Sequence, residues 1–240
     1  MSSIIKNAYT FFKLARIYLS EAAQAPEGQS QAIRAKYTRQ LLDTMQIEIS
    51  GPTPEDIQKM GPCIYVANHS SALDALMICA FFEGDLRILA KEGLFRIPRL
   101  GAILEKEKHI KVYRGKDSHE RNQSIRTNIK AALESGGSVF IFPEGTRTKT
   151  GDLGKFRLGA FFNAIQCGVP IVPVVIRGTF DAMPPSTLSV RPGKCSLELL
   201  EPIGLSDASE GDEETRANKL ADLAKDAIAR ALDKKSRMDQ

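Results

Sequence analysis

The sequence predicts an α/β domain whose sheet is mostly parallel and flanked by helices. From residue 61 onward, short apolar runs alternate with segments of helical periodicity, as in repeated β-α units. The run at 139–142 is apolar without interruption, which is typical of a strand buried on both faces. The 240 residues suffice for one large domain or for one domain with an appendage.

Residues 1–50 are predicted to form an N-terminal amphipathic two-helix element at a membrane interface, ahead of the domain at 51–240. Apolar residues recur at helical spacing through 2–20 and again through about 30–45, and basic residues stand among them. Such helices can lie in a membrane interface; the alternative is that both pack on the domain. The scattered basic residues do not follow the order of a signal peptide, so we do not expect secretion.

The elements of the domain follow from the same periodicities. Strands are predicted at 63–67, 86–90, 109–113, 138–142, 171–176 and 195–199. Helices are predicted at 71–82, 118–134 and 159–167, with a last amphipathic helix around 220–231. Pro173 lies inside a strand run and lacks an N–H, which indicates an edge position or a bulge.

Charge is unevenly distributed along the chain. Residues 87–130 carry twelve basic and five acidic side chains, a local excess of seven positive charges. A basic middle suits an anionic small substrate or a negative membrane surface, while a solvated charged face is the alternative. We expect no nucleic-acid partner. The four cysteines have neither zinc nor disulfide-framework spacing, so we expect reduced thiols and no metal site.

His69 and Asp74 are the candidate catalytic pair. They follow the strand predicted at 63–67 and lie five residues apart, which would separate them on a regular helix. They meet if His69 lies in the turn and the helix begins at Ser70 or Ser71, both favourable N-cap residues. Asp74 then accepts from His69 Nδ1–H and leaves Nε2 as a base. The alternative is a polar histidine at a helix start beside an unrelated aspartate.

The other histidines and serines are weaker candidates. His109 and His119 lie in charged segments, and we expect both at the surface. A serine nucleophile elbow of the form G-x-S-x-G is absent from the sequence. Direct base catalysis is therefore favoured over an acyl-serine intermediate.

A phosphate-binding turn is predicted after the strand at 138–142. The sequence Phe-Pro-Glu-Gly-Thr-Arg at 142–147 offers a glycine for a tight turn and, in Arg147, a guanidinium that matches phosphate geometry. Arg114 follows another predicted strand and is a second phosphate candidate. Ligands of open α/β sheets bind beyond the carboxyl ends of the strands, so His69 and both arginines are expected in one cleft.

Four ordered blocks resemble the glycerolipid acyltransferase family, whose members include the lysophosphatidate acyltransferases. Asn68–Asp74 looks like the N-H-x4-D block, and 142–147 matches the F-P-E-G-T-R block in full. Arg114 ends a stretch that looks like the second block, although Tyr113 stands where the family often has an acid. The apolar proline segment at 169–174 looks like the fourth block. The resemblance spans about residues 61–178.

The resemblance implies transfer of a fatty acyl group from acyl-CoA or acyl carrier protein to the free hydroxyl of 1-acylglycerol 3-phosphate, giving phosphatidate. His69 would be the general base and Asp74 its orienting partner. The acceptor's phosphate would be held by Arg114, Glu144, Gly145, Thr146 and Arg147. Backbone donors near Ser70 and Ser71 would stabilise the oxyanion, and the acyl side would be lined by Pro170, Ile171 and Val172.

The expected partners are the lysophospholipid, the acyl thioester, an anionic membrane surface and, as an alternative thioester donor, acyl carrier protein. No cofactor is expected. The expected location is peripheral or monotopic, on the cytoplasmic face of the inner (plasma) membrane. Two alternatives stay open: the same chemistry on another acceptor, such as a lyso-ornithine lipid, another lysophospholipid or glycerol 3-phosphate, and a non-catalytic lipid-binding protein that keeps the same shell.

Overall fold

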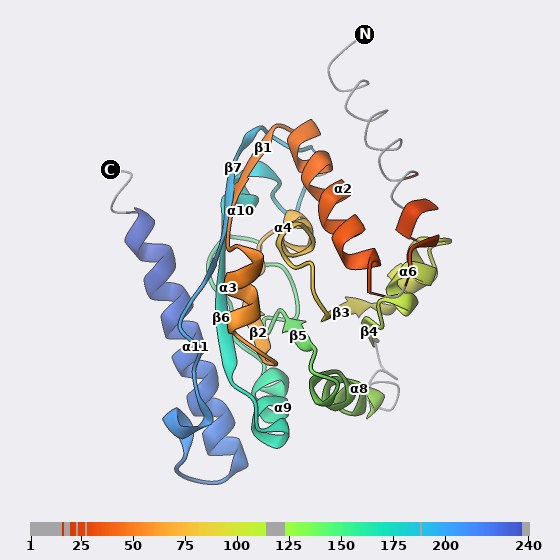
Figure 1. The fold of residues 1–240 in the computed structure, drawn as a ribbon. Coiled ribbons are helices and arrows are strands. Elements are labelled where there is room, and N and C mark those ends of the chain that lie inside the picture. The colour runs from red at the N-terminus through yellow and green to blue at the C-terminus, as the bar shows by residue number, and fades with distance from the viewer. Residues whose placement is uncertain are drawn as a thin grey trace.

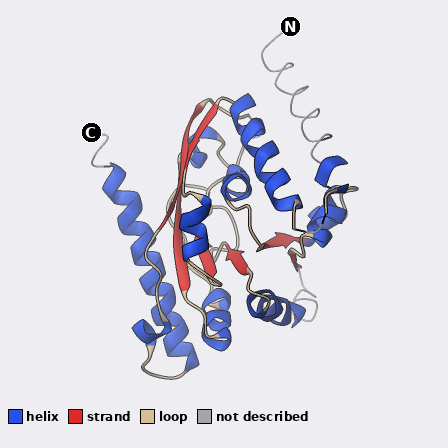
Figure 2. Ribbon diagram, in the orientation of Figure 1, coloured by secondary structure: helices blue, strands red, loops and turns tan. Residues whose placement is uncertain are grey.

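The computed structural model describes residues 16, 20–22, 24–26, 28–113, 123–187 and 189–236. One seven-stranded sheet runs through the molecule, with helices on both faces (Figures 1 and 2). The strands are β1 Ile47–Ser50, β2 Ile64–Ala67, β3 Leu86–Lys91, β4 Ile110–Val112, β5 Ser138–Ile141, β6 Ile171–Arg177 and β7 Gly193–Leu199. The helices are α2 Ser30–Thr44, α3 Pro54–Lys59, α4 Leu73–Phe81, α5 Glu92–Phe95, α6 Leu100–Lys106, α8 Gln123–Glu134, α9 Gly159–Cys167, α10 Thr179–Ala182, the 3-10 turn η1 Leu205–Ala208 and α11 Glu213–Ser236.

The sheet order is β1-β7-β6-β2-β5-β3-β4. Every neighbouring pair is parallel except β6 and β7, which are antiparallel. The carboxyl ends of β2, β5, β3 and β4 therefore lie at one edge of the sheet, where ligands of such sheets bind. The predicted fold class, a mostly parallel α/β sheet flanked by helices, is confirmed.

Two hydrophobic cores lie on the two faces of the sheet, and β2 shows how the sequence makes them. Ile64 and Val66 point into the core that contains α8, α9 and α11, whereas Tyr65 and Ala67 point into the core that contains α2 and α4. This is the alternation expected of a strand. Because both faces are covered, the whole run is apolar and fully buried.

The predicted strand and helix cores are found within a few residues of their expected bounds, and the helix at 159–167 coincides with α9. The exception is the last helix, predicted around 220–231, which extends over Glu213–Ser236. The prediction omitted β1, α3, α5, α6, α10 and η1, which are all six residues long or shorter except α6, which has seven. Short elements offer too few positions for a period to show.

Pro173 is not on an edge strand, because β6 pairs with β2 on one side and β7 on the other. The antiparallel ladder stops at Val174–Leu199 and resumes at the isolated bridge Ile171–Ile203. These positions are three residues apart on β6 and four residues apart on the other strand. Pro173 lies in this irregularity, where its missing N–H breaks no ladder bond.

The structure tests only part of the prediction for residues 1–50. Most of the helix predicted at 2–20 lies outside the described residues. The second predicted helix is α2, which packs against α4 and β1, while β1 already pairs within the sheet before residue 51. The boundary at residue 50 and the membrane role stay predictions. Within the described ranges, the structure contains no helix whose length and apolarity would allow it to cross a bilayer.

His109 is buried, so the prediction that it lies at the surface is wrong. Its Nδ1 accepts a hydrogen bond from the Ile88 N–H at 3.1 Å, and its Nε2 lies 3.1 Å from Glu107 Oε2. Glu107 also pairs with Arg34 of α2, whose guanidinium donates to the Phe82 carbonyl. These buried hydrogen bonds and ion pairs connect α2 to the end of α4, to the end of α6 and to β3. His119 lies outside the described residues.

Candidate active site

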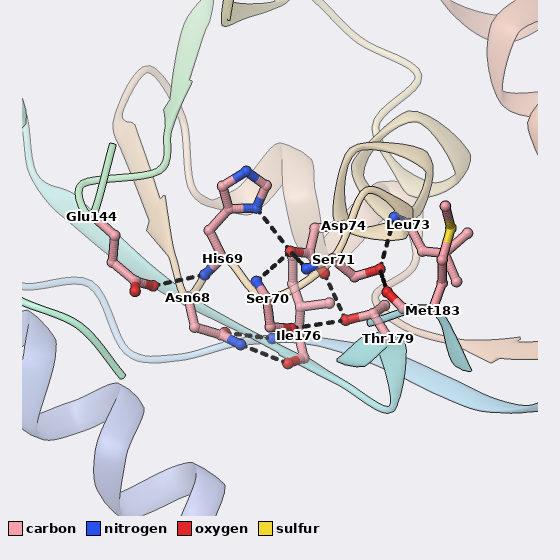
Figure 3. Close-up of polar contacts among 10 residues, drawn as sticks. All are labelled: Asn68, His69, Ser70, Ser71, Leu73, Asp74, Glu144, Ile176, Thr179 and Met183. Atoms are coloured by element: carbon pink, nitrogen blue, oxygen red, sulfur yellow. Dashed lines mark hydrogen bonds and ion pairs between the residues drawn. The ribbon is translucent and has the colours of Figure 1, made fainter. Parts of the chain in front are cut away.

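His69 and Asp74 meet as predicted (Figure 3). His69 Nδ1 lies 2.8 Å from Asp74 Oδ2. The Asp74 side chain is completely buried, whereas one fifth of the His69 side chain is exposed. The imidazole also stacks on Phe142, with ring centroids 3.9 Å apart. A ring held on one nitrogen by a buried carboxylate carries its proton there, which leaves Nε2, on the opposite side of the ring, as an acceptor.

The turn between β2 and α4 makes this contact possible. Helix α4 begins at Leu73, later than predicted, and Ala72 occupies its N-cap position without a side-chain cap. The Ser70 and Ser71 N–H groups instead donate to Asp74 Oδ2 at 2.7 and 2.8 Å. Since both amides are bonded to this carboxylate, the expectation that they stabilise an oxyanion is not supported. Their role is to hold Asp74 in place.

Thr179 is a site residue that the sequence reasoning missed. Its hydroxyl donates to Asp74 Oδ1 at 2.6 Å, and the residue is fully buried. Asp74 therefore accepts hydrogen bonds on both oxygens, three on Oδ2 and one on Oδ1. Such a fully bonded carboxylate has one orientation available to it. In the sequence, only the position of Gly178 and Thr179 directly after an apolar strand pointed to a site. Thr179 and Asp74 are 105 residues apart in the chain.

Glu144 fastens the second loop to the histidine. One carboxylate oxygen accepts the His69 N–H at 2.7 Å and the other accepts the Gly154 N–H at 3.0 Å. The Thr148 N–H returns a bond to the His69 carbonyl at 2.9 Å. Burial raises the pKa of Glu144, opposed by the two backbone donors. A buried carboxylate occupied in this way is placed to shape the loop, and its geometry argues against the expected direct phosphate contact.

Gly145, Thr146 and Arg147 form the turn after Glu144. Gly145 has φ 73°, and a Cβ there would lie 2.8 Å from the Arg157 Nε. Thr146 and Arg147 are exposed and border a cavity of about 810 Å³. The other charged side chains at this cavity are basic at Lys155, Arg157 and Lys225 and acidic at Glu144, Glu214 and Asp222. His69 is not among the residues that line it, so the expected single cleft for His69 and Arg147 is not seen in this cavity. Arg147, exposed at the end of a parallel strand, has the donor geometry that suits an anionic headgroup.

The remaining predicted residues are not brought to His69. Ile171 and Val172 are fully buried at the amino end of β6, and the Pro170 carbonyl accepts the Ile64 N–H at the start of β2. His69 follows the carboxyl end of β2. The segment predicted to line the acyl chain therefore lies at the opposite end of the strands from His69. Arg114 lies outside the described residues. Among the described residues, no group of acidic, cysteine and histidine side chains has the arrangement of a metal site.

Fold and site together define a class: an α/β protein in which a partly exposed histidine pairs with a buried aspartate, beside an arginine-bearing turn. The family described as Acyltransferase matches residues 47–177, which is more than half of the chain, and the chain belongs to this family. This confirms the resemblance inferred from the four blocks.

Several named proteins are similar to this chain. A chloroplastic 1-acyl-sn-glycerol-3-phosphate acyltransferase from Brassica napus is 34% identical over 162 residues, which are 67% of this chain and 46% of that protein. The chain thus spans about half the length of the first curated relatives it matches. A 1-acyl-sn-glycerol-3-phosphate acyltransferase from Haemophilus influenzae is 28% identical over 82% of this chain and 81% of its own.

A solved structure shares the fold. The 1-acyl-sn-glycerophosphate acyltransferase of Thermotoga maritima superposes with a TM-score of 0.75 at 22% identity, covering 96% of this chain and 98% of that one.

Proposed function

We propose that this protein transfers a fatty acyl group from a thioester, acyl-CoA or acyl carrier protein, to the free hydroxyl of 1-acylglycerol 3-phosphate. The observation that carries the proposal is the His69–Asp74 pair at 2.8 Å, with Asp74 buried and bonded on both oxygens. The names of the Brassica napus and Haemophilus influenzae relatives give the acceptor class.

The chemistry follows from the orientation of His69. Its Nε2 accepts the proton of the acceptor hydroxyl as the oxygen attacks the thioester carbonyl. The tetrahedral intermediate collapses with cleavage of the C–S bond, and the leaving thiolate takes the proton from the imidazolium. Asp74 stabilises that imidazolium between the two steps. No acyl group is bonded to the protein at any stage.

Arg147 is proposed to hold the phosphate of the acceptor. Its loop is joined to His69 through Glu144 and Thr148, so the phosphate and the attacking hydroxyl are fixed relative to each other. Orienting the hydroxyl in this way lowers the barrier by removing freedom before the reaction. Both substrates are amphiphiles, and we propose that the protein works peripherally at the cytoplasmic face of a membrane.

The test is thiol release from oleoyl-CoA, measured with and without 1-oleoyl-glycerol 3-phosphate, and repeated with acylated carrier protein. Release should depend on the acceptor. Arg147→Ala should raise the acceptor KM by about tenfold or more, the loss of one charge-assisted contact, with the thioester KM unchanged. Lys149→Ala, an exposed cation two residues away, is the matched control.

Two outcomes would contradict the proposal. If release is independent of every lysophospholipid and glycerol phosphate supplied, with either donor, the protein is not this transferase. If Arg147→Ala changes only the thioester KM, the phosphate role of Arg147 is wrong.

A further inference from the structure

Two large apolar side chains are exposed where α5 passes into α6. Of the large hydrophobic side chains in the described part of the chain, only Leu94 and Ile97 are exposed, at 41% and 45%. They lie three residues apart where α5 passes into α6. Single exposed apolar side chains are ordinary and this pair is small, so its significance comes from the charges beside it.

Cationic side chains surround this pair. Lys91, Arg96 and Arg99 are all exposed. The acids nearby are engaged, because Glu92 pairs with Arg96 at 2.6 Å, Glu105 pairs with Lys111, and Glu107 is buried against Arg34. Since Glu92 offsets Arg96, the excess positive charge comes from Lys91 and Arg99. The surface formed by Lys91, Leu94, Arg96, Ile97 and Arg99, here called the α5–α6 surface, is therefore apolar at its centre and positive around it. This composition complements anionic lipid headgroups above a hydrocarbon layer.

The position of the α5–α6 surface relates it to His69. Helix α5 begins directly after the carboxyl end of β3, and His69 follows the carboxyl end of β2. Both strands are parallel to β5, which lies between them. The exposed pair and the catalytic pair consequently lie at the same edge of the sheet.

The α5–α6 surface is rigidly supported. A Cβ at Gly101 would lie 2.0 Å from the Phe95 carbonyl oxygen, so α5 and α6 pack in direct backbone contact. Lys106 of α6 donates to the carbonyls of Ala22, at 3.0 Å, and Ala25. Residues 22 and 25 of the N-terminal segment therefore lie beside α6 (Figure 1).

We propose that the α5–α6 surface is a membrane contact that inserts Leu94 and Ile97 into the interface of an anionic bilayer. It turns the carboxyl edge of the sheet, with His69, toward the lipid. Its effect on catalysis rests on the proposed function, whereas the binding itself does not. An acceptor could then reach His69 without leaving the bilayer surface for bulk water.

The experiment is co-sedimentation of the full chain with vesicles of phosphatidylcholine, with and without 30% phosphatidylglycerol by composition, roughly the charge needed for a negative surface. The double variant Leu94→Asp/Ile97→Asp should lower partitioning onto anionic vesicles by about tenfold or more. Leu94→Asn/Ile97→Asn, which adds no charge, should do the same more weakly. Lys91→Gln/Arg99→Gln should weaken anionic binding, while Lys194→Gln/Lys219→Gln, an equal charge change at exposed sites outside the surface, should not.

Activity on a short-chain acceptor that stays monomeric separates docking from chemistry. The Leu94/Ile97 variants should keep their kcat/KM on this acceptor within about twofold of wild type, since the surface does not touch the reacting groups. Unchanged sedimentation of these variants would overturn the proposal, as would equal binding to neutral vesicles. So would a shift from dimer to monomer in light scattering with vesicle binding intact, because the surface would then join two copies of the chain. If the Leu94/Ile97 variants lose vesicle binding while the wild-type protein shows no transferase activity, the membrane surface is supported and the proposed function is refuted.

Discussion

His69 and His109 are both paired with a carboxylate, yet only one is placed to act as a base. His69 contacts Asp74 through Nδ1 at 2.8 Å and keeps a fifth of its side chain exposed. His109 contacts Glu107 through Nε2 at 3.1 Å, accepts the Ile88 N–H on Nδ1, and is almost completely buried. Its accepting nitrogen is already occupied, so it has no lone pair to offer a substrate. The difference teaches that a histidine–carboxylate pair becomes a base only when its second nitrogen stays unoccupied.

The largest effect is expected from exchanging the two histidines for glutamine one at a time. His69→Gln should lower kcat by about three orders of magnitude, because the proton acceptor is removed. His109→Gln should leave kcat per folded molecule nearly unchanged. Steady-state thiol release on samples of equal circular dichroism checks this, and equal losses in both variants would break the comparison.

Stability should respond in the opposite order. His109→Ala removes one of the two partners of the buried Glu107 carboxylate, which keeps Arg34, and leaves the Ile88 N–H without its acceptor. We expect a loss of about 1–3 kcal/mol in the free energy of unfolding. His69→Ala, at a partly exposed position, should cost about 1 kcal/mol or less. Urea denaturation measures both. A larger loss at His69 would mean that the turn between β2 and α4 contributes more to stability than the buried contacts among Arg34, Glu107 and His109.

A smaller effect is expected at Thr179. Thr179→Val removes the hydroxyl that donates to Asp74 Oδ1 and should lower kcat by about tenfold with little change in either KM. Thr179→Ser restores the donor and should recover most of the rate. A KM change, or failure of serine to rescue, would show that the residue acts by packing and does not position Asp74.

The smallest effect is the pH dependence of stability. Burial lowers the pKa of His109 from 6.5, opposed by its hydrogen bond with Glu107. The unfolded chain therefore binds a proton that the folded protein does not as the pH falls below 6.5, so stability is present above that pH and is lost on acidification. In His109→Gln the fall in Tm between pH 6.5 and 5 should be shallower. An unchanged slope would mean that other groups control it.

Local chemistry was predictable from the sequence, and distant pairing was not. The His69–Asp74 contact spans five residues, so a strand followed by a helix start was enough to infer it. Thr179 and Glu144 reach the same site from 105 and 75 residues away, and no local period reports such distances. His109 was misplaced because its Lys/Glu-rich neighbours suggested solvent, while Glu107 in fact turns inward to Arg34, 73 residues earlier.

Glu144 has a consequence for which acceptors fit. Its two oxygens bond the amides of His69 and Gly154, so the length of one side chain fixes the span between the base and the cationic loop. For the proposed transferase, that span would act as a ruler, selecting molecules whose free hydroxyl and phosphate are separated by a set number of bonds. Glu144→Asp shortens it by one methylene, and the proposed transferase activity would then shift among glycerol phosphates with the length of the headgroup that the site bridges.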